Sequence, residues 1–145
     1  MRETMIRLLK ESRSCVLATC SRNQPHCSLM AYLTDESGQT VYMITQRGSR
    51  KFQNMQENPL VSLLVDTRER GETPHMSPVR ALTVYGRFQS LEDGTKREEI
   101  LRRLLDGHPH LSALAAYPDA EVFAIRLQSF LLLDGVTDAY FENLQ

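Results

Sequence analysis

The sequence predicts a mainly β domain with peripheral helices, organised as a small antiparallel barrel. Short stretches rich in β-branched and apolar residues recur along the chain, and compact polar turns separate most of them. Such turns join neighbouring strands as hairpins, and hairpins imply antiparallel pairing. A sheet of about six short strands avoids exposed edges by closing on itself, so a barrel is the expected architecture.

Length and composition limit the number of domains and the kinds of partner. The chain has 145 residues, which suits one domain over 1–145, and its formal net charge is −1. A balanced charge gives no support for a nucleic-acid or membrane-surface partner, and no apolar run is long enough to span a bilayer. Three cysteines, Cys15, Cys20 and Cys27, suit buried reduced thiols. We expect a cytoplasmic protein without a metal site, because no His/Cys spacing matches a metal-ligand motif.

Periodicity and turn residues place the elements. The first helix, over 2–12, directs Met5, Leu8 and Leu9 inward, and Asp93 opens a later one that Gly107 ends. Gly86 marks a bulge in its strand. The expected strands are 14–20, 26–34, 40–46, 60–65, 78–91 and 121–133; the expected helices are 2–12, 50–56, 93–107 and 111–117; a polar loop covers 67–77, and a polar tail follows 133.

The centre of the prediction is the stretch from Thr40 to Asp66, read as strand, basic turn, helix and buried strand. Ser49 is a good N-cap for the helix, and Asn58-Pro59 stops it. Two cations, Arg50 and Lys51, then lie at the helix N-terminus together with hydroxyls and free backbone N–H groups. This combination is what a phosphate monoester requires.

An ordinary solvated turn is the competing interpretation of the same residues. Gly-Ser-Arg-Lys is a common surface sequence, and a cation at a helix start opposes the helix dipole. That unfavourable pair of charges favours the anion site slightly, and the surrounding chain favours it further.

The order of these elements resembles the FMN-binding split-barrel family typified by pyridoxamine 5′-phosphate oxidase. The motifs that carry the resemblance are PHCSLM, VYMITQRGSRKFQNMQENPLVSLLVD and VYGRFQSL, and together with the rest they cover nearly the whole chain. The resemblance implies a six-stranded antiparallel split β-barrel that binds FMN. It also implies a homodimer with FMN at the interface, lined by both chains.

Site residues follow from matching positions. In that family the Arg-Lys pair and nearby hydroxyls hold the FMN phosphate, which here implies Thr45, Ser49, Arg50 and Lys51, with Ile44 beside them on the central strand. The second strand runs beside the flavin ring in that family, which implies Ser28, Leu29 and Met30. Plain core packing is the alternative for Leu29 and Met30, because apolar strand residues are usually core.

Departures from the family pattern limit the function. The tail after Arg126 contains no Arg, His or Trp, so the substrate clamp of the longer enzyme is missing, and Tyr32 stands near where that enzyme has a basic residue. Both features argue against vitamin B6 oxidation. We expect an FMN-dependent oxidoreductase on an unknown small substrate. A non-catalytic flavin, heme or tetrapyrrole binding module, a deaza-flavin protein and a scaffold with a vestigial site are the alternatives. No catalytic residue can be assigned; Tyr32, His75 and Arg80 are candidates for proton transfer, and the 67–77 loop for substrate contacts.

Overall fold

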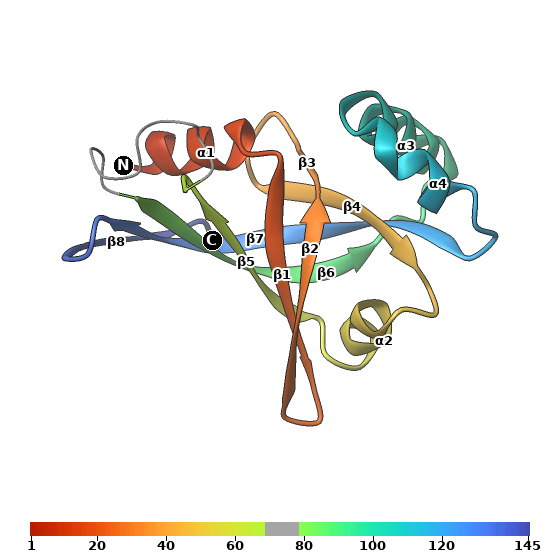
Figure 1. The fold of residues 1–145 in the computed structure, drawn as a ribbon, viewed down its shortest axis with the longest axis horizontal. Helices are drawn as coiled ribbons and strands as arrows, with labels where there is room; N and C mark the ends of the chain where they lie inside the picture. The colour runs from red at the N-terminus through yellow and green to blue at the C-terminus, as the bar shows by residue number, and fades with distance from the viewer. Residues whose placement is uncertain (69–78) are drawn as a thin grey trace.

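The structure, a computed structural model, describes residues 1–68 and 79–145. Within them the chain forms one curled antiparallel sheet with helices around it (Figure 1). The helices are α1 (Arg2–Glu11), α2 (Arg50–Glu57), α3 (Gly94–Gly107), a 3-10 turn (Pro109–Leu111) and α4 (Ser112–Ala115). The strands are β1 (Ser14–Ser21), β2 (Gln24–Ala31), β3 (Leu33–Thr34), β4 (Thr40–Gln46), β5 (Leu60–Asp66), β6 (Arg80–Ser90), β7 (Ala120–Asp134) and β8 (Asp138–Asn143).

The sheet is an incomplete barrel whose two ends approach each other through the short strand β3. Its order is β2-β1-β5-β6-β7-β4-β3, and β8 pairs with β7. β3 pairs with Val41 and Tyr42 at the start of β4. In the described residues β2 pairs only with β1, and the second half of β4, 43–46, pairs only with β7. The unpaired edges of β2 and β4 therefore form the split in the barrel.

The core lies on the concave side of the sheet. Leu17, Leu63, Val84 and Phe130 occupy opposite positions on four neighbouring strands, and all four are fully buried. Helix α1 adds Met5, Leu8 and Leu9 to this cluster, as the sequence predicts. A second cluster lies between α3, α4 and the outer side of β4 and β7; it contains Tyr42, Ile44, Ile100, Leu104, Val122 and Ala124.

The opposite side of the sheet is open and largely apolar. One row of residues in register runs across β2, β1, β5, β6, β7 and β8: Leu29, Val16, Leu64, Thr83, Leu131 and Phe141. Leu29 and Phe141, at its two ends, are 77% and 62% exposed. The expectation that 60–65 is buried on both faces is wrong, because Leu60 and Leu64 face this open side while Val61 and Leu63 face the core.

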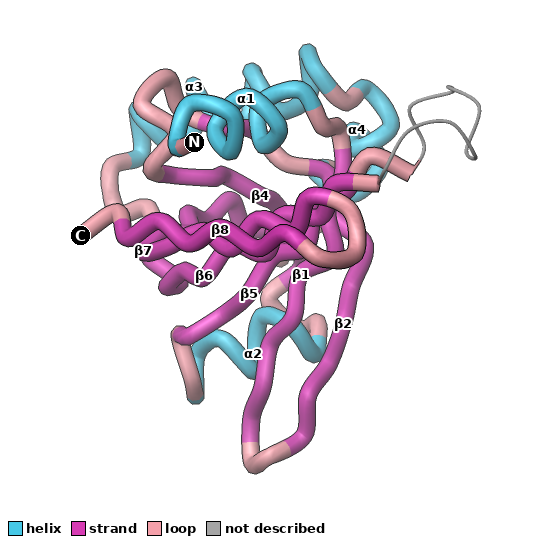
Figure 2. Tube along the Cα trace, turned by 90° about the vertical axis from the view of Figure 1, so that its left-hand side faces the viewer, coloured by secondary structure: helices cyan, strands magenta, loops and turns pink. Residues whose placement is uncertain are grey.

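The prediction of six strands is also wrong, at two places. The strand expected over 26–34 is divided at Tyr32, because the residues before it pair with β1 and those after it pair with β4. The Tyr32 side chain lies in the core, and its hydroxyl donates to the Leu9 carbonyl at 2.5 Å. The tail expected to be irregular forms β8, which pairs with the end of β7 (Figure 2).

Other local predictions are confirmed. The register shifts between Tyr85 and Gly86, where a bulge was expected. A Cβ at Gly86 would lie 2.6 Å from Cγ2 of Ile125, so only glycine fits there. Asp93 caps α3, and Gly107 ends it.

The cysteines are only partly as expected. Cys15 is buried, and burial raises the pKa of its thiol to about 12. Cys20 is half-buried and Cys27 is exposed, because both point towards the open face. No helix within 1–68 and 79–145 has the length and apolar character needed to cross a bilayer.

Candidate anion-binding site

The turn between β4 and α2 gathers the predicted phosphate-binding residues. Ser49 caps α2, since its hydroxyl accepts a hydrogen bond from the Phe52 N–H at 3.3 Å. The hydroxyls of Thr45 and Ser49 share a hydrogen bond at 3.1 Å, although they belong to different elements. Thr45 is only 3% exposed. The predicted strand, turn and helix thus place both hydroxyls beside the first turn of α2.

Helix α2 is held rigidly against the barrel. Phe52 contacts Phe88 edge-to-face with ring centroids 5.8 Å apart, and Met55 is fully buried. The Asn54 side-chain amide donates to the Thr19 hydroxyl at 3.0 Å, which fastens the helix to β1. Figure 1 shows α2 lying below the split between β2 and β4. A ligand bound at the first turn of α2 would therefore face a fixed set of donors.

Two cations at this helix start have no counter-charge among the described residues. Within 1–68 and 79–145, the side chains of Arg50 and Lys51 make no ion pair or hydrogen bond. Desolvation by burial lowers the pKa of Lys51 below its usual value. The Arg50 and Lys51 N–H groups lack intrahelical acceptors because they lie in the first turn of the helix. The Ser49 side chain accepts from the Phe52 N–H and leaves these two groups free. Backbone donors and cations of this kind together form a site suited to an anion.

An open hollow of about 810 Å³ lies against the exposed side of α2. Arg50, Gly48 and Gln53 line it from the turn and the helix, and Gln24 lines it from β2. The exposed Arg50 therefore borders a space large enough for a ligand that reaches from α2 to β2.

The three predicted β2 residues have different environments. Leu29 points to the open face, whereas Met30 is 7% exposed and belongs to the core cluster. Ser28 is half-buried at the unpaired edge. Core packing is thus the correct interpretation for the Met30 side chain but not for Leu29. Ile44 packs into the α3 cluster, so its side chain points away from the turn, as does that of Met30. A ligand contact from Ile44 would therefore come from its backbone on the unpaired edge of β4, whereas the backbone groups of Met30 face β1.

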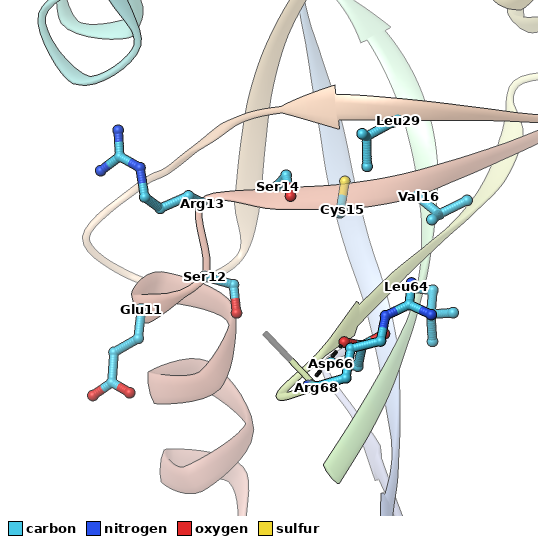
Figure 3. Close-up of a pocket in the computed structure, with 10 residues that line it drawn as sticks. All are labelled: Glu11, Ser12, Arg13, Ser14, Cys15, Val16, Leu29, Leu64, Asp66 and Arg68. Atoms are coloured by element: carbon cyan, nitrogen blue, oxygen red, sulfur yellow. Dashed lines mark hydrogen bonds and ion pairs between the residues drawn. The ribbon is translucent and has the colours of Figure 1, made fainter. Parts of the chain in front are cut away.

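A second hollow, of about 270 Å³, adjoins Leu29 (Figure 3). Leu29, Val16 and Leu64 form an apolar wall on three neighbouring strands. Its rim is polar: Arg68 pairs with Asp66 through Nε at 3.2 Å and lies beside Leu64. An apolar wall with a polar rim suits a flat aromatic group.

Asp119, which the sequence did not single out, binds the turn from the opposite side. Its carboxylate oxygens accept from the Gly48 N–H at 3.3 Å and from the Gln46 side-chain amide at 3.2 Å. Its carbonyl accepts from the Arg47 N–H at 2.9 Å. The Gln46 hydrogen bond, ahead of that from Gly48, lowers the pKa of Asp119. Arg47 itself pairs with Glu121 at 3.3 Å and lines the same hollow as Arg50. A lone Asp some seventy residues from the turn leaves no local signal in the sequence.

The candidates for proton transfer are not assembled into one site. The Tyr32 hydroxyl is committed to the Leu9 carbonyl, and burial raises its pKa. Arg80 pairs with Asp134 at 3.3 Å, on the open side. His75 and most of the 67–77 loop lie outside the described residues. The described part of the chain contains no group of three or more His, Cys, Asp or Glu side chains placed to hold a metal.

Comparison with known proteins decides the family. The sequence profile described as pyridoxamine 5′-phosphate oxidase matches residues 1–133. The chain belongs to the pyridoxamine 5′-phosphate oxidase family. A pyridoxamine 5′-phosphate oxidase homolog of Schizosaccharomyces pombe is 38% identical over an alignment of 77 residues that covers 46% of this chain and 40% of that protein. The match thus spans less than half of the curated relative.

Solved structures share the fold. A heme binding protein from Mycobacterium smegmatis superposes with a TM-score of 0.83 at 15% identity, covering 97% of this chain and 57% of that one. An FAD-binding protein from Mesorhizobium loti superposes with a TM-score of 0.71 at 20% identity, covering 91% of each chain. These structures show the fold alone: the prediction of a mainly β, antiparallel split barrel with peripheral helices is confirmed, and its six strands are not.

Proposed function

We propose that this protein binds FMN, with the flavin phosphate at the first turn of α2. The observation that carries the proposal is Lys51, a partly desolvated cation with no counter-charge in the described chain. An unpaired, partly buried charge costs stability, so its presence beside free N–H groups and hydroxyls indicates a ligand that compensates it. A phosphate dianion is suited to Arg50, Lys51, Ser49 and Thr45 together.

The flavin ring would extend from this turn along β2. The unpaired edge of β2 offers backbone groups to the polar edge of an isoalloxazine. Counted from the two-residue turn at Arg22-Asn23, the hairpin register directs the backbone N–H and C=O of Leu29 to this edge and those of Ser28 and Met30 to β1. Leu29 offers an apolar surface on the other side of the same strand. The Ile44 backbone lies on the facing, equally unpaired edge of β4.

We further propose that a second copy of the chain covers the open sheet face. The in-register row that runs from Leu29 to Phe141 across the sheet is apolar except at Thr83. Exposed bands of this extent on soluble proteins mark interfaces. A two-fold dimer buries the same surface twice, and it would close the split over a flavin that one chain alone leaves exposed.

The proposed activity is that of a flavin-dependent oxidoreductase acting on a small substrate. Bound FMN would supply hydride acceptance and donation, while this chain's residues bind the phosphate, orient the ring and exclude water. Pyridoxamine 5′-phosphate is not the substrate we propose, because Tyr32, near the position of a basic residue in that enzyme, is buried and its hydroxyl donates to the Leu9 carbonyl. Unpaired thiols, with no disulfide in the described chain, support action in the cytoplasm.

A heme module is the second candidate, because a structural neighbour is titled a heme binding protein. His26 is the half-buried histidine on the β2 edge that such a module would use. The Lys51 observation favours the flavin, since heme carboxylates do not need a helix N-terminus with paired hydroxyls.

One purification tests these proposals. The absorption spectrum of the protein and mass spectrometry of the ligand released on denaturation distinguish FMN from heme or a deaza-flavin. Light scattering should give a dimer, and NADH or NADPH should bleach the flavin bands. A Soret band instead of flavin bands would refute the cofactor, and a monomer with full FMN occupancy would refute the shared site. Formation of pyridoxal 5′-phosphate at about 1 s⁻¹ would refute the substrate prediction.

A further inference from the structure

The turn that presents the proposed phosphate donors is shaped by a residue outside it. We propose that Asp119 is a positioning residue for phosphate recognition: it holds the 46–48 turn in the conformation that presents Ser49, Arg50 and Lys51 to the anion. This inference rests on the proposed binding of FMN and adds a residue, from the loop before β7, that does not contact the ligand.

Three consecutive residues of the turn donate to this one aspartate. Gln46 donates from its side chain, and Arg47 and Gly48 donate from their backbone N–H groups. Within the turn itself there is one backbone hydrogen bond, from the Ser49 N–H to the Gln46 carbonyl at 3.0 Å. Most of the hydrogen bonds that define the turn therefore come from Asp119.

Glycine does not fix the turn. The described glycines with positive φ are Gly38 and Gly135, and Gly48 is not among them. A Cβ at Gly48 would meet Asp119 Oδ2 at 3.6 Å, an ordinary contact distance. The backbone conformation of the turn is therefore open to many residues, and its position depends on the bonds to Asp119.

The negative charge of Asp119 does not by itself favour phosphate binding. A carboxylate close to a phosphate site repels the ligand, so its net effect on affinity through space is unfavourable. Glu121, which pairs with Arg47 nearby, would repel the ligand in the same way but accepts no hydrogen bond from the turn backbone. The two acids thus share a charge and differ in their contact with the turn.

This difference provides the test. We compare Asp119→Ala and Asp119→Asn with the matched controls Glu121→Ala and Glu121→Gln, measuring the affinity for FMN and for riboflavin and the melting temperature of the flavin-free protein. The Asp119→Ala variant should bind FMN about tenfold more weakly than wild type and riboflavin within about twofold of wild type. The FMN affinity of Asp119→Asn should lie between those of wild type and Asp119→Ala, because one amide oxygen can accept only part of the hydrogen bonds that the two carboxylate oxygens accept.

The controls should bind FMN as wild type does or slightly more tightly, since they remove a repelling charge and leave the turn intact. Equal losses of FMN and riboflavin affinity in Asp119→Ala would indicate a general structural role and overturn the inference, as would an unchanged FMN affinity. A wild-type protein that does not prefer FMN to riboflavin would instead overturn the proposed function, whatever the variants do.

Discussion

Helices α2 and α3 both carry two consecutive cations near their N-termini, as the first two residues of α2 and as the third and fourth of α3. The two helix starts differ in what surrounds these charges. In α3, the Asp93 carboxylate accepts from the Thr95 and Lys96 N–H groups at 3.0 and 3.3 Å. Arg97 donates to the Leu91 carbonyl at 2.8 Å, and Lys96 lies 5.8 Å from the Tyr42 ring centroid. The N-terminus of α3 therefore contains its own anion and partners for both cations.

The start of α2 contains none of these partners. Its cap is the neutral Ser49, and its cations Arg50 and Lys51 have no ion pair or hydrogen bond within the described chain. Both helices thus share a sequence pattern, but only α2 leaves its dipole and its cations uncompensated. The comparison teaches that the sequence pattern of cap and cations does not by itself identify an anion site; the missing internal anion does.

The largest effect is expected from giving α2 the cap of α3. Ser49→Asp places a carboxylate where the phosphate would bind, and two like charges at about 4 Å repel by about 4 kcal/mol at a protein surface. FMN affinity should fall by at least about 100-fold, while the flavin-free protein should become more stable by about 0.3–1 kcal/mol through the helix dipole. Isothermal titration and thermal unfolding of the same sample measure both. Unchanged FMN binding would show that the α2 start is not the site.

Removing single cations should affect FMN affinity at the start of α2 and not at the start of α3. Arg50→Ala and Lys51→Ala should each weaken FMN binding by roughly 10- to 100-fold, since charge-assisted bonds to phosphate contribute about 1.5–3 kcal/mol. The matched variants Lys96→Ala and Arg97→Ala should leave FMN affinity within about threefold of wild type. Similar losses at both helices would mean that overall charge, rather than a defined site, attracts the flavin.

Lys51 should also show a pH-dependent cost to stability. Its pKa is lowered in the folded protein, so protonated Lys51 destabilises the flavin-free fold, and the cost disappears as the pH rises from the lowered pKa to the ordinary value of 10.5. The Lys51→Met variant keeps the apolar stem without the charge. It should equal or exceed the flavin-free wild type in unfolding free energy near neutral pH, and this advantage should vanish towards pH 10.5. A variant less stable than wild type at neutral pH would show that Lys51 already has a stabilising partner.

The smallest effect is expected at the other helix start. Asp93→Ser gives α3 the cap of α2 and should cost about 0.5–1 kcal/mol, because a serine still caps but the dipole loses its anion. Chemical denaturation measures this change, and FMN titration serves as the control. A loss of FMN affinity in Asp93→Ser would contradict the assignment of the FMN site to the start of α2 alone.

Local patterns predicted local structure well. The Ser49 cap, the Asp93 cap, the Gly86 bulge and the inward face of α1 all depend on residues within one or two turns of each other. These features follow from hydrogen bonding and sterics that the neighbouring sequence determines. The predicted turn residues were therefore brought together as expected.

Tertiary contacts account for what was missed. The break at Tyr32 marks the change of pairing from β1 to β4, and β8 pairs with the end of β7. Exposed and buried side chains alternate along β5 because one face of the sheet is open, and a run of apolar residues in the sequence does not show this. Asp119 reaches the turn only through the pairing of β7 with β4. Each is set by residues distant in sequence, where single-sequence patterns carry little information.

The central claim is that the start of α2 recognises a phosphate, and a titration of the flavin-free wild-type protein with FMN and with riboflavin tests it most directly. The two ligands share the ring system and differ only in the phosphate. With two unpaired cations and free N–H groups at the site, FMN should bind at least about 100-fold more tightly than riboflavin. Equal affinity for the two flavins would contradict the account, because the phosphate would then make no contact that the cations of α2 provide.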